Sequence, residues 1–438
     1  MANRLIVGAA AAIFAAAAIL FSGVLRPDAP AAATDVLPTA VAAELAKGFA
    51  AGDTQAEILG LQGELRLNSH NVKALDTLGL AYLQRVRETG DPTYYPKAQG
   101  ILDEALTQAP HDLIATAGLG QLALSRHQFG QALVIGRRAQ RISPTTAGVY
   151  GVIGDAEIEL GRYRQAFKTF DHMAALKPDV ASYARVSYGR ELIGHIAAAE
   201  RAMRLAASAA LGAKEASSWT HVQLGLLYLG HSASKRALIE MQHALEVDPT
   251  YYVALDGIAQ VQGSLGHVRT ALVYEQAAVN RVPLPAQVAL LGDLYRATGK
   301  PVAAKREYAL IGVIEKLLAA NGVRNDLDIA LFDADHGISV SHALQLARKG
   351  YAERPSVFGD DVLAWTLARN GHCQAALHYS ERSLRLGTQD ALKFFHRGWI
   401  EACLGNRTQA ASWYRRALAL NPTFSLLWAP VARAGAST

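Results

Sequence analysis

Prolines and glycines recur along this chain at a spacing of 34 residues. The spacing holds in three separate stretches, which are Pro110–Pro144–Pro178, Pro249–Pro283 and Gly337–Gly371–Gly405. Self-similarity at a period of this length is typical of proteins built from stacked structural repeats, whose units are too small to fold alone. The repeat therefore constrains the fold more than any other feature of the sequence.

Each period contains the pattern of two short helices. In residues 147–178, Val149 and Ile153 lie on one helical face, Gly161 interrupts the pattern, and a second apolar face follows before Pro178. Glycine commonly ends a helix, and proline cannot continue one. Two such helices cannot bury both apolar faces alone, whereas stacked neighbours can.

These units resemble the tetratricopeptide repeat, a helix–turn–helix unit of the same length. The residues that carry the resemblance are Leu224-Gly225, Tyr228, Ala237, Ala244 and Pro249 in the unit that starts at Trp219, and Gly398, Gly405, Ala410, Tyr414, Ala417 and Pro422 in the last unit. About ten units fit between Val72 and Pro422. The resemblance implies an all-α fold, a right-handed α-solenoid of helix–turn–helix repeats.

The same pattern divides the chain. We expect N-terminal capping helices over 39–71, the solenoid over 72–422, and a C-terminal capping helix and tail over 423–438, with the helix at 423–433. Solenoid ends need caps because their last apolar faces have no neighbour. An insertion at 85–97 separates the two helices of the first unit.

An apolar segment precedes the repeats. Residues 5–25 form an uncharged run of 21 residues. As a helix the run would be roughly 31 Å long, enough to cross a bilayer. We therefore interpret 1–25 as a signal peptide or a membrane anchor, and 26–38 as a Pro/Ala linker. Ala31–Ala33 could serve as a cleavage site, whereas the length of the run favours an uncleaved anchor. Both alternatives place the repeats outside the cytoplasm, and the composition points to the periplasmic side of a bacterial envelope.

Charge and motifs exclude several function classes. Without Arg4 and Arg26, which flank the apolar segment, the chain has 41 basic and 38 acidic residues, so we expect no nucleic-acid partner. The sequence contains no P-loop, GxSxG, HExxH or CxxC motif. No catalytic residue, cofactor or metal is therefore predicted, and no His pair at i, i+4 supports a metal site near the cysteines.

The two cysteines occupy adjacent helices of the predicted stack. Cys373 begins the second helix of one unit, and Cys403 ends the first helix of the next. Neighbouring helices in such a stack run antiparallel, so the two thiols could meet and form a disulfide in an exported protein. The alternative is two independent buried thiols.

The concave face of the solenoid is the candidate binding site. In the tetratricopeptide family, certain first-helix positions line a groove. Those positions, together with the nearby Trp365, are Gln121, Asp155, Glu159, Tyr188, Glu191, Trp219, Asp256, Gln260, Asp293, Arg296, Phe358, Asp361, Trp365, Arg369, Phe395 and Trp399. The middle of this set is acidic and its C-terminal end is aromatic, so we expect the groove to accept an extended or helical segment with basic side chains. The alternative is that these residues form solvated helix faces and core packing.

We therefore predict a non-catalytic protein-interaction scaffold or adaptor of the cell envelope, attached to the membrane through residues 5–25. Its expected partner is another envelope protein. The alternative function is an assembly or regulatory subunit of an envelope machine for export or cofactor insertion. The sequence leaves the oligomeric state open.

Overall fold

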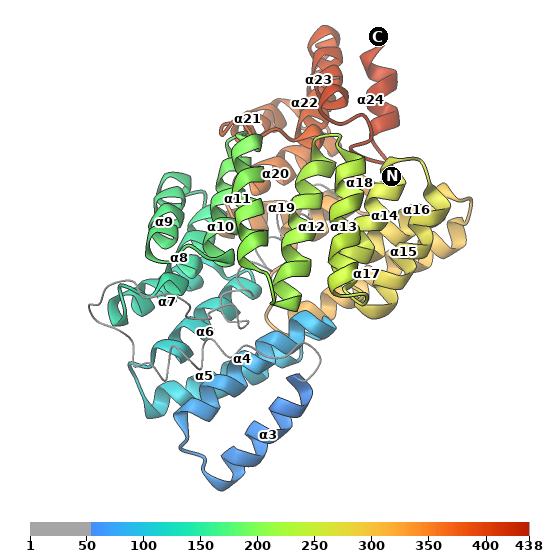
Figure 1. The fold of residues 1–438 in the computed structure, drawn as a ribbon. Helices are drawn as coiled ribbons and strands as arrows, with labels where there is room; N and C mark the ends of the chain where they lie inside the picture. Colours follow the sequence, from blue (N-terminus) through green and yellow to red (C-terminus); the bar gives the residue numbers. More distant parts are fainter. Residues whose placement is uncertain (1–53, 438) are drawn as a thin grey trace.

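The chain is all-helical in a computed structural model that describes residues 54–437 (Figure 1). The helices are α3 (Thr54–Leu67), α4 (Val72–Thr89), α5 (Tyr94–Gln108), α6 (Leu113–Ser125), α7 (Phe129–Ile142), α8 (Ala147–Glu159), α9 (Tyr163–Leu176), α10 (Val180–Leu192), α11 (Ile196–Ala209), α12 (Lys214–Gly230), α13 (Ser234–Val247), α14 (Tyr252–Ser264), α15 (Val268–Arg281), α16 (Pro285–Ala297), α17 (Pro301–Ala320), α18 (Asp326–His336), α19 (Val340–Glu353), α20 (Val357–Arg369), α21 (Cys373–Ser383), α22 (Ala391–Cys403), α23 (Arg407–Leu420) and α24 (Ala429–Ala436).

Consecutive helices pair into antiparallel hairpins, and each hairpin packs on the next. Ten hairpins follow one another, from α4–α5 to α22–α23, with α3 before the first and α24 after the last. The predicted all-α repeat fold is confirmed. The predicted N-terminal hydrophobic helix lies outside the described residues, and none of the described helices combines the length and hydropathy that a bilayer span requires.

Local sequence signals set the helix boundaries. The side chain of Asp112 accepts a hydrogen bond from the backbone N–H of Ala115 at 2.8 Å and caps the start of α6. Between the two helices of a hairpin the chain often passes through a left-handed glycine, such as Gly161 (φ 70°) or Gly405 (φ 83°). Residues with a Cβ rarely adopt this conformation, which explains the recurring glycines of the sequence.

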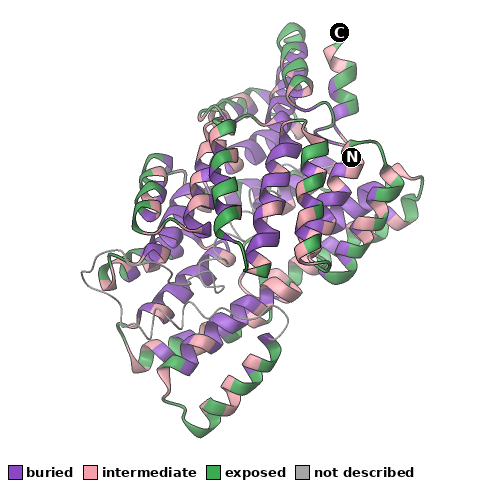
Figure 2. Ribbon diagram, in the orientation of Figure 1, coloured by how far each residue is buried: buried purple, intermediate pink, exposed green. Residues whose placement is uncertain are grey.

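The first helices of the hairpins form an inner layer and the second helices an outer one. In α8 every residue except Gly148 is buried, whereas α9 buries only the stripe of Tyr163, Ala166, Phe170 and Met173. Figure 2 shows the same contrast between the purple α12 and the largely exposed α11 and α13. Most of the core therefore lies between the layers and around the inner helices.

Glycines allow the two helices of a hairpin to approach closely. A Cβ on Gly154 would lie 2.3 Å from Cε1 of Phe170, and one on Gly292 would lie 2.3 Å from Cε1 of Tyr308. In each case the contact joins the first helix of a hairpin to an aromatic side chain of the second. This contact explains why a glycine accompanies an aromatic residue sixteen positions later in these units.

The solenoid coils back onto itself, a feature that the repeat pattern does not predict. Residues 188 to 197 positions apart touch repeatedly along the chain. The turn of the second hairpin, between α6 and α7, contacts the loop between α17 and α18, which joins the seventh hairpin to the eighth. The turns of the following hairpins contact later loops at about the same distance along the sequence. We call these contacts the seam, formed by residues 126–128, 159–163, 192–194 and 229–232 on one side and 322–324, 354–357, 387–388 and 420–421 on the other.

Backbone groups take part in the seam. The N–H of Arg324 donates to the carbonyl oxygen of Arg126 at 3.0 Å, and Oγ1 of Thr388 donates to the carbonyl oxygen of Leu192 at 2.5 Å. Nδ2 of Asn421 donates to the carbonyl oxygen of Leu229 at 3.0 Å. One superhelical turn therefore takes between five and six hairpins, and successive turns are in contact.

Two boundaries differ from the sequence-based expectation. The closing helix begins at Ala429 rather than at residue 423, because Pro430 suits the first turn of a helix and Phe424 and Trp428 are used for packing before it. The segment 85–97 is largely helical, since α4 continues to Thr89 and α5 starts at Tyr94. The insertion therefore lengthens a helix instead of forming a long loop.

Candidate partner-binding face

The inner layer carries all the residues predicted to line the groove, and their exposure varies. Nine are buried: Gln121, Asp155, Glu159, Trp219, Asp256, Asp293, Asp361, Trp365 and Phe395. Six are half-buried: Tyr188, Glu191, Gln260, Phe358, Arg369 and Trp399, while Arg296 is exposed. Their role in binding a partner stays a prediction, but the structure shows what each acidic and aromatic member contacts.

Asp155 forms a buried ion pair with Arg185 of the next hairpin. The guanidinium donates from Nε at 2.9 Å and from Nη2 at 2.6 Å to the two carboxylate oxygens, and Nη1 donates to the carbonyl oxygen of Ala181 at 3.0 Å. Arg185 is 1% exposed. This two-pronged geometry fixes both side chains and holds α8 against α10.

Glu159 accepts a hydrogen bond from Nε of Arg354 across the seam. Both side chains are buried, and the Arg354 guanidinium lies 4.5 Å from the ring centroid of Phe358 and 5.4 Å from that of Phe129. Asp328 adds a second carboxylate, at 3.8 Å from the guanidinium. The predicted acidic residue therefore binds a cation of this chain and ties one superhelical turn to the next.

Asp293 is paired with a histidine in the same way. Nε2 of His336 lies 2.9 Å from Oδ1 of Asp293, and the Tyr308 hydroxyl donates to the same oxygen at 2.6 Å. Burial lowers the pKa of His336, but the hydrogen bond and charge of Asp293 outweigh burial, so the net pKa is above 6.5. The two groups form a buried, charge-assisted pair between α16 and α18.

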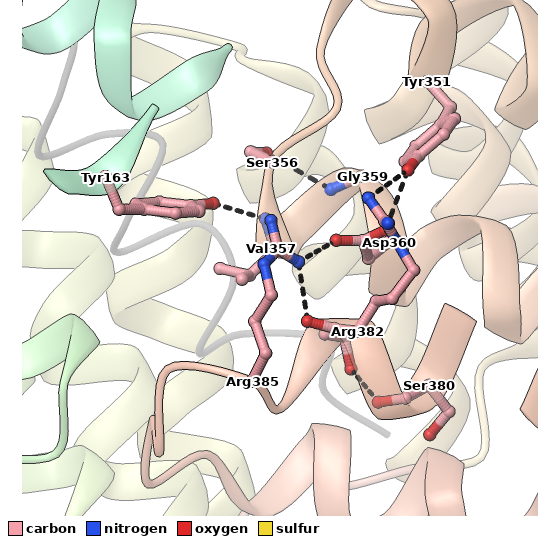
Figure 3. Close-up of polar contacts among 10 residues, drawn as sticks. Tyr163, Tyr351, Ser356, Val357, Gly359, Asp360, Ser380, Arg382 and Arg385 are labelled. Carbon is pink, nitrogen blue, oxygen red and sulfur yellow. Dashed lines mark hydrogen bonds and ion pairs between the residues drawn. The ribbon is translucent and has the colours of Figure 1, made fainter. Parts of the chain in front are cut away.

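A second seam cluster surrounds Asp360 on α20, which the sequence analysis did not identify (Figure 3). Its carboxylate accepts hydrogen bonds from the Tyr351 hydroxyl at 2.9 Å, from Nε of Arg382 at 2.8 Å and from Nη1 of Arg385. Across the seam, the hydroxyl of Tyr163 accepts the N–H of Val357 at 2.5 Å.

The cluster around Asp360 joins one carboxylate to two guanidinium groups. Arg385 also lies over the Tyr163 ring, 5.3 Å from its centroid. No local sequence signal distinguishes Asp360 from its neighbour Asp361, because its partners come from α19, from α21 and from Arg385, two residues beyond the end of α21. The position of these groups at the seam indicates a structural role.

The aromatic end of the predicted groove is a packed cluster. Trp365 is fully buried, 5.4 Å from Trp428 and 5.6 Å from Trp399 between ring centroids. The indole N–H groups of Trp365 and Trp428 both donate to Oδ1 of Asp335, at 2.8 and 2.9 Å. Arg369 covers the cluster, with its guanidinium 5.2 Å from the Trp365 ring. Trp365 therefore belongs to the core, whereas Trp399 is half-buried at its edge.

Several inner-layer side chains have a buried polar atom that forms no hydrogen bond with any described residue. All of the following lie on first helices: Oε1 of Gln121, Nε1 of Trp219, Nε2 of Gln223, Oε1 of Gln287, Oδ1 of Asp361 and Nε2 of His396. Buried polar atoms in native proteins are nearly always hydrogen-bonded, so such a row indicates groups that water or a bound partner satisfies.

Glu191 is an inner-layer carboxylate whose negative charge is compensated only in part. Burial and the charge of Asp390 raise its pKa to about 7, because Lys393 offsets their effect only in part. Glu191 forms no ion pair with any residue of the described range 54–437. The charges of Glu191 and Asp390 thus repel each other here, an arrangement that favours a cation.

Gln260 lines a pocket between α14 and the segment that follows α23. The other walls of the pocket include Leu229, Leu290, Asn421 and Phe424. Most of these residues are apolar or amide-bearing, so the pocket offers hydrogen bonds and apolar contacts but no charge.

Cys373 and Cys403 are bonded to each other in the structure, with their Cα atoms 6.1 Å apart. Cys373 is the first residue of α21 and Cys403 the last of α22, so the bond links two consecutive hairpins. Antiparallel packing brings the start of one helix beside the end of the next.

No family model matches the chain, and the comparison with curated proteins found no match. Among solved structures it is similar to human IFIT1, from a dimer with PPP-AAAA, at 15% identity and a TM-score of 0.45, covering 84% of this chain and 87% of that one. It is similar to a tetratricopeptide repeat protein from Parabacteroides merdae at 18% identity and a TM-score of 0.35, covering 59% of this chain and 97% of that one. A chain of the APC/C hetero-tetramer Cut9–Hcn1 is 11% identical, with a TM-score of 0.38, and covers 87% of this chain and 93% of its own length.

The classification depends on the structure of the chain itself. Ten consecutive helix hairpins have the length of the sequence repeat, and first-helix glycines such as Gly154 and Gly292 receive an aromatic side chain of the second helix. The motif residues quoted above occupy the positions that produce this packing. The chain therefore folds as an α-solenoid of helix hairpins with the length and helix packing typical of tetratricopeptide units.

Proposed function

We propose that this protein is a non-catalytic scaffold that holds a segment of a protein partner along the inner layer of its solenoid. The observation that carries the proposal is the row of buried polar atoms on first helices that have no partner among the described residues. The six atoms lie on the first helices α6, α12, α16, α20 and α22. Hydrogen-bond donors and acceptors distributed in this way suit an extended main chain, which offers one donor and one acceptor per residue.

The charge of the proposed partner follows from the carboxylates that remain uncompensated. Asp155, Glu159 and Asp293 are held by Arg185, Arg354 and His336, so they do not contribute a free negative charge. Glu191 is compensated only in part by Lys393, and its raised pKa shows that its ionised form lacks a sufficient counter-charge beside Asp390. The proposed segment therefore places a Lys or Arg beside Glu191, with apolar side chains near Trp399.

The proposed location is the outer side of a bacterial cytoplasmic membrane. Two observations support it. The uncharged segment 5–25 is long enough for an anchor or an export signal, and the paired cysteines suit an oxidising compartment. The proposed partner is accordingly another envelope protein.

The test combines a charge reversal with crosslinking. A photo-reactive residue at the half-buried Tyr188 of the inner layer, compared with one at the exposed Val134 of the outer layer, should capture a protein in cells only from the inner position. Glu191→Lys should then weaken this crosslink, because it replaces the proposed counter-charge, while Glu191→Gln should weaken it less.

A matched control is Glu246→Lys, which makes the same charge change at an exposed position of the outer helix α13. It should leave the crosslink at Tyr188 unchanged. Equal crosslinking from Tyr188 and Val134, or equal losses for the two charge reversals, would contradict binding along the inner layer.

A further inference from the structure

Three potential metal ligands meet on the fifth hairpin, away from the seam. His221 lies on α12, and Glu240 and His243 lie three residues apart on α13. Their ligand atoms all lie within 4.8 Å of one another. No sequence motif signals this site, because its ligands come from two helices.

The three side chains already converge on one point. Nδ1 of His221 lies 2.8 Å from Oε2 of Glu240, and Nδ1 of His243 lies 3.9 Å from the same oxygen. The two imidazole rings are 5.3 Å apart between centroids and nearly perpendicular, at 71°. Ligand atoms around a tetrahedral Zn²⁺ lie about 3.3 Å from one another, since each is about 2.0–2.1 Å from the ion. Small side-chain rotations would bring the three atoms to that spacing.

The donor set selects the class of ion. Two imidazoles and one carboxylate suit Zn²⁺, Co²⁺, Ni²⁺ or Cu²⁺, while Ca²⁺ and Mg²⁺ prefer oxygen ligands alone. The side chains of His221, Glu240 and His243 are 24%, 18% and 45% exposed, so an ion could enter from solvent. Three protein ligands leave a fourth position open for water or for a side chain of another molecule.

The basic side chains near the three ligands are paired with other groups, so they should repel a metal cation only weakly. Arg204 interacts electrostatically with Glu240, but its guanidinium is bound to Glu200 at 2.6 Å. Arg236 shares the same Glu200 carboxylate at 3.4 Å and lies over the ring of Tyr228, 3.8 Å from its centroid. Both cations are thus engaged elsewhere, and Glu240 is left with the two histidines.

We propose that His221, Glu240 and His243 bind one divalent transition-metal ion and so clamp α12 to α13. This inference is independent of the proposed scaffold function, since the site lies between the two helices of one hairpin and requires no partner. Binding requires neutral imidazoles, so it should release protons at a pH where the histidines are partly protonated.

The test uses the full chain without a histidine tag, freed of metal, with Co²⁺ as the probe. One equivalent of Co²⁺ should produce the visible absorption of a four- or five-coordinate site, and Zn²⁺ should displace it. His243→Ala and Glu240→Gln should each weaken Co²⁺ binding at least about tenfold, since each removes one of three ligands. The control His378→Ala, which removes an exposed histidine of another second helix, should leave the affinity unchanged.

Measuring the melting temperature of each variant separates a loss of metal binding from a folding defect. The metal-free variants should melt at the wild-type temperature, and Zn²⁺ should raise the melting temperature of the wild type and of His378→Ala only. Absence of Co²⁺ binding at millimolar concentration would overturn the proposal. Equal affinity in His243→Ala and the wild type would overturn it as well.

Discussion

Arg354→Met should be among the most damaging single substitutions in this protein. The change removes the guanidinium that binds Glu159 across the seam while keeping an apolar side chain between Phe129 and Phe358. Glu159 is 1% exposed, so its carboxylate would remain buried without a counterion. Breaking a buried ion pair by removing one partner costs about 3–5 kcal/mol.

The assay is urea unfolding followed by far-UV circular dichroism, with the disulfide kept oxidised. The free energy of unfolding should fall by about 3–5 kcal/mol in Arg354→Met. The double variant Glu159→Leu/Arg354→Met should recover most of this loss, because neither charge is then buried alone. Hydrogen exchange should show lost protection on both sides of the seam, in α8 and in α20, which are distant in sequence.

Arg324→Met is the matched control. Arg324 also pairs with a glutamate, at 2.6 Å from Glu353, but the two side chains are 51% and 38% exposed. Exposed pairs contribute under about 1 kcal/mol. If Arg354→Met lost no more stability than Arg324→Met, or if protection fell only in α20, the seam would not couple the superhelical turns as argued.

Three further predictions concern packing, the disulfide and pH. Gly154→Ala should lower the stability by about 1–3 kcal/mol through overpacking against the second helix, whereas Gly100→Ala, whose Cβ would meet no atom within 4 Å, should be neutral or stabilising in the same denaturation assay. Cys403→Ser removes the disulfide and opens a loop with a sequence separation of 30. The freed loop entropy of the unfolded chain should lower the stability by roughly 3–4 kcal/mol relative to the oxidised wild type. Reducing the disulfide of the wild type should cause an equal loss. The raised pKa of His336 means that its protonated form stabilises the fold below pH 6.5 and that this contribution disappears as the pH rises through the raised value. His336→Gln should therefore flatten the dependence of the melting temperature on pH above 6.5, and an unchanged slope would contradict the pairing with Asp293.

The site could be predicted from the sequence only in part. The first-helix positions taken from the tetratricopeptide repeat lie on the inner layer of the structure. The sequence also placed Cys373 and Cys403 on adjacent helices, and the structure shows them bonded to each other. The spacing of apolar residues and the helix-ending glycines do not reveal which charged residues form pairs. The partners are distant in the sequence: Arg185 lies 30 residues from Asp155, Arg354 lies 195 from Glu159, and His336 lies 43 from Asp293. The acidic character predicted for the groove is thereby largely neutralised within the chain.

The amino-acid sequence by itself determined the hairpin, its length of about 34 residues and its stacking in series, because these depend on contacts between near neighbours in the chain. Only the tertiary structure decided how tightly the stack coils. Each hairpin is rotated slightly relative to the one before it, and these rotations add up to the coiling of the solenoid. No local residue pattern encodes the total rotation. The seam and the burial of Glu159 and Asp360 follow from that geometry.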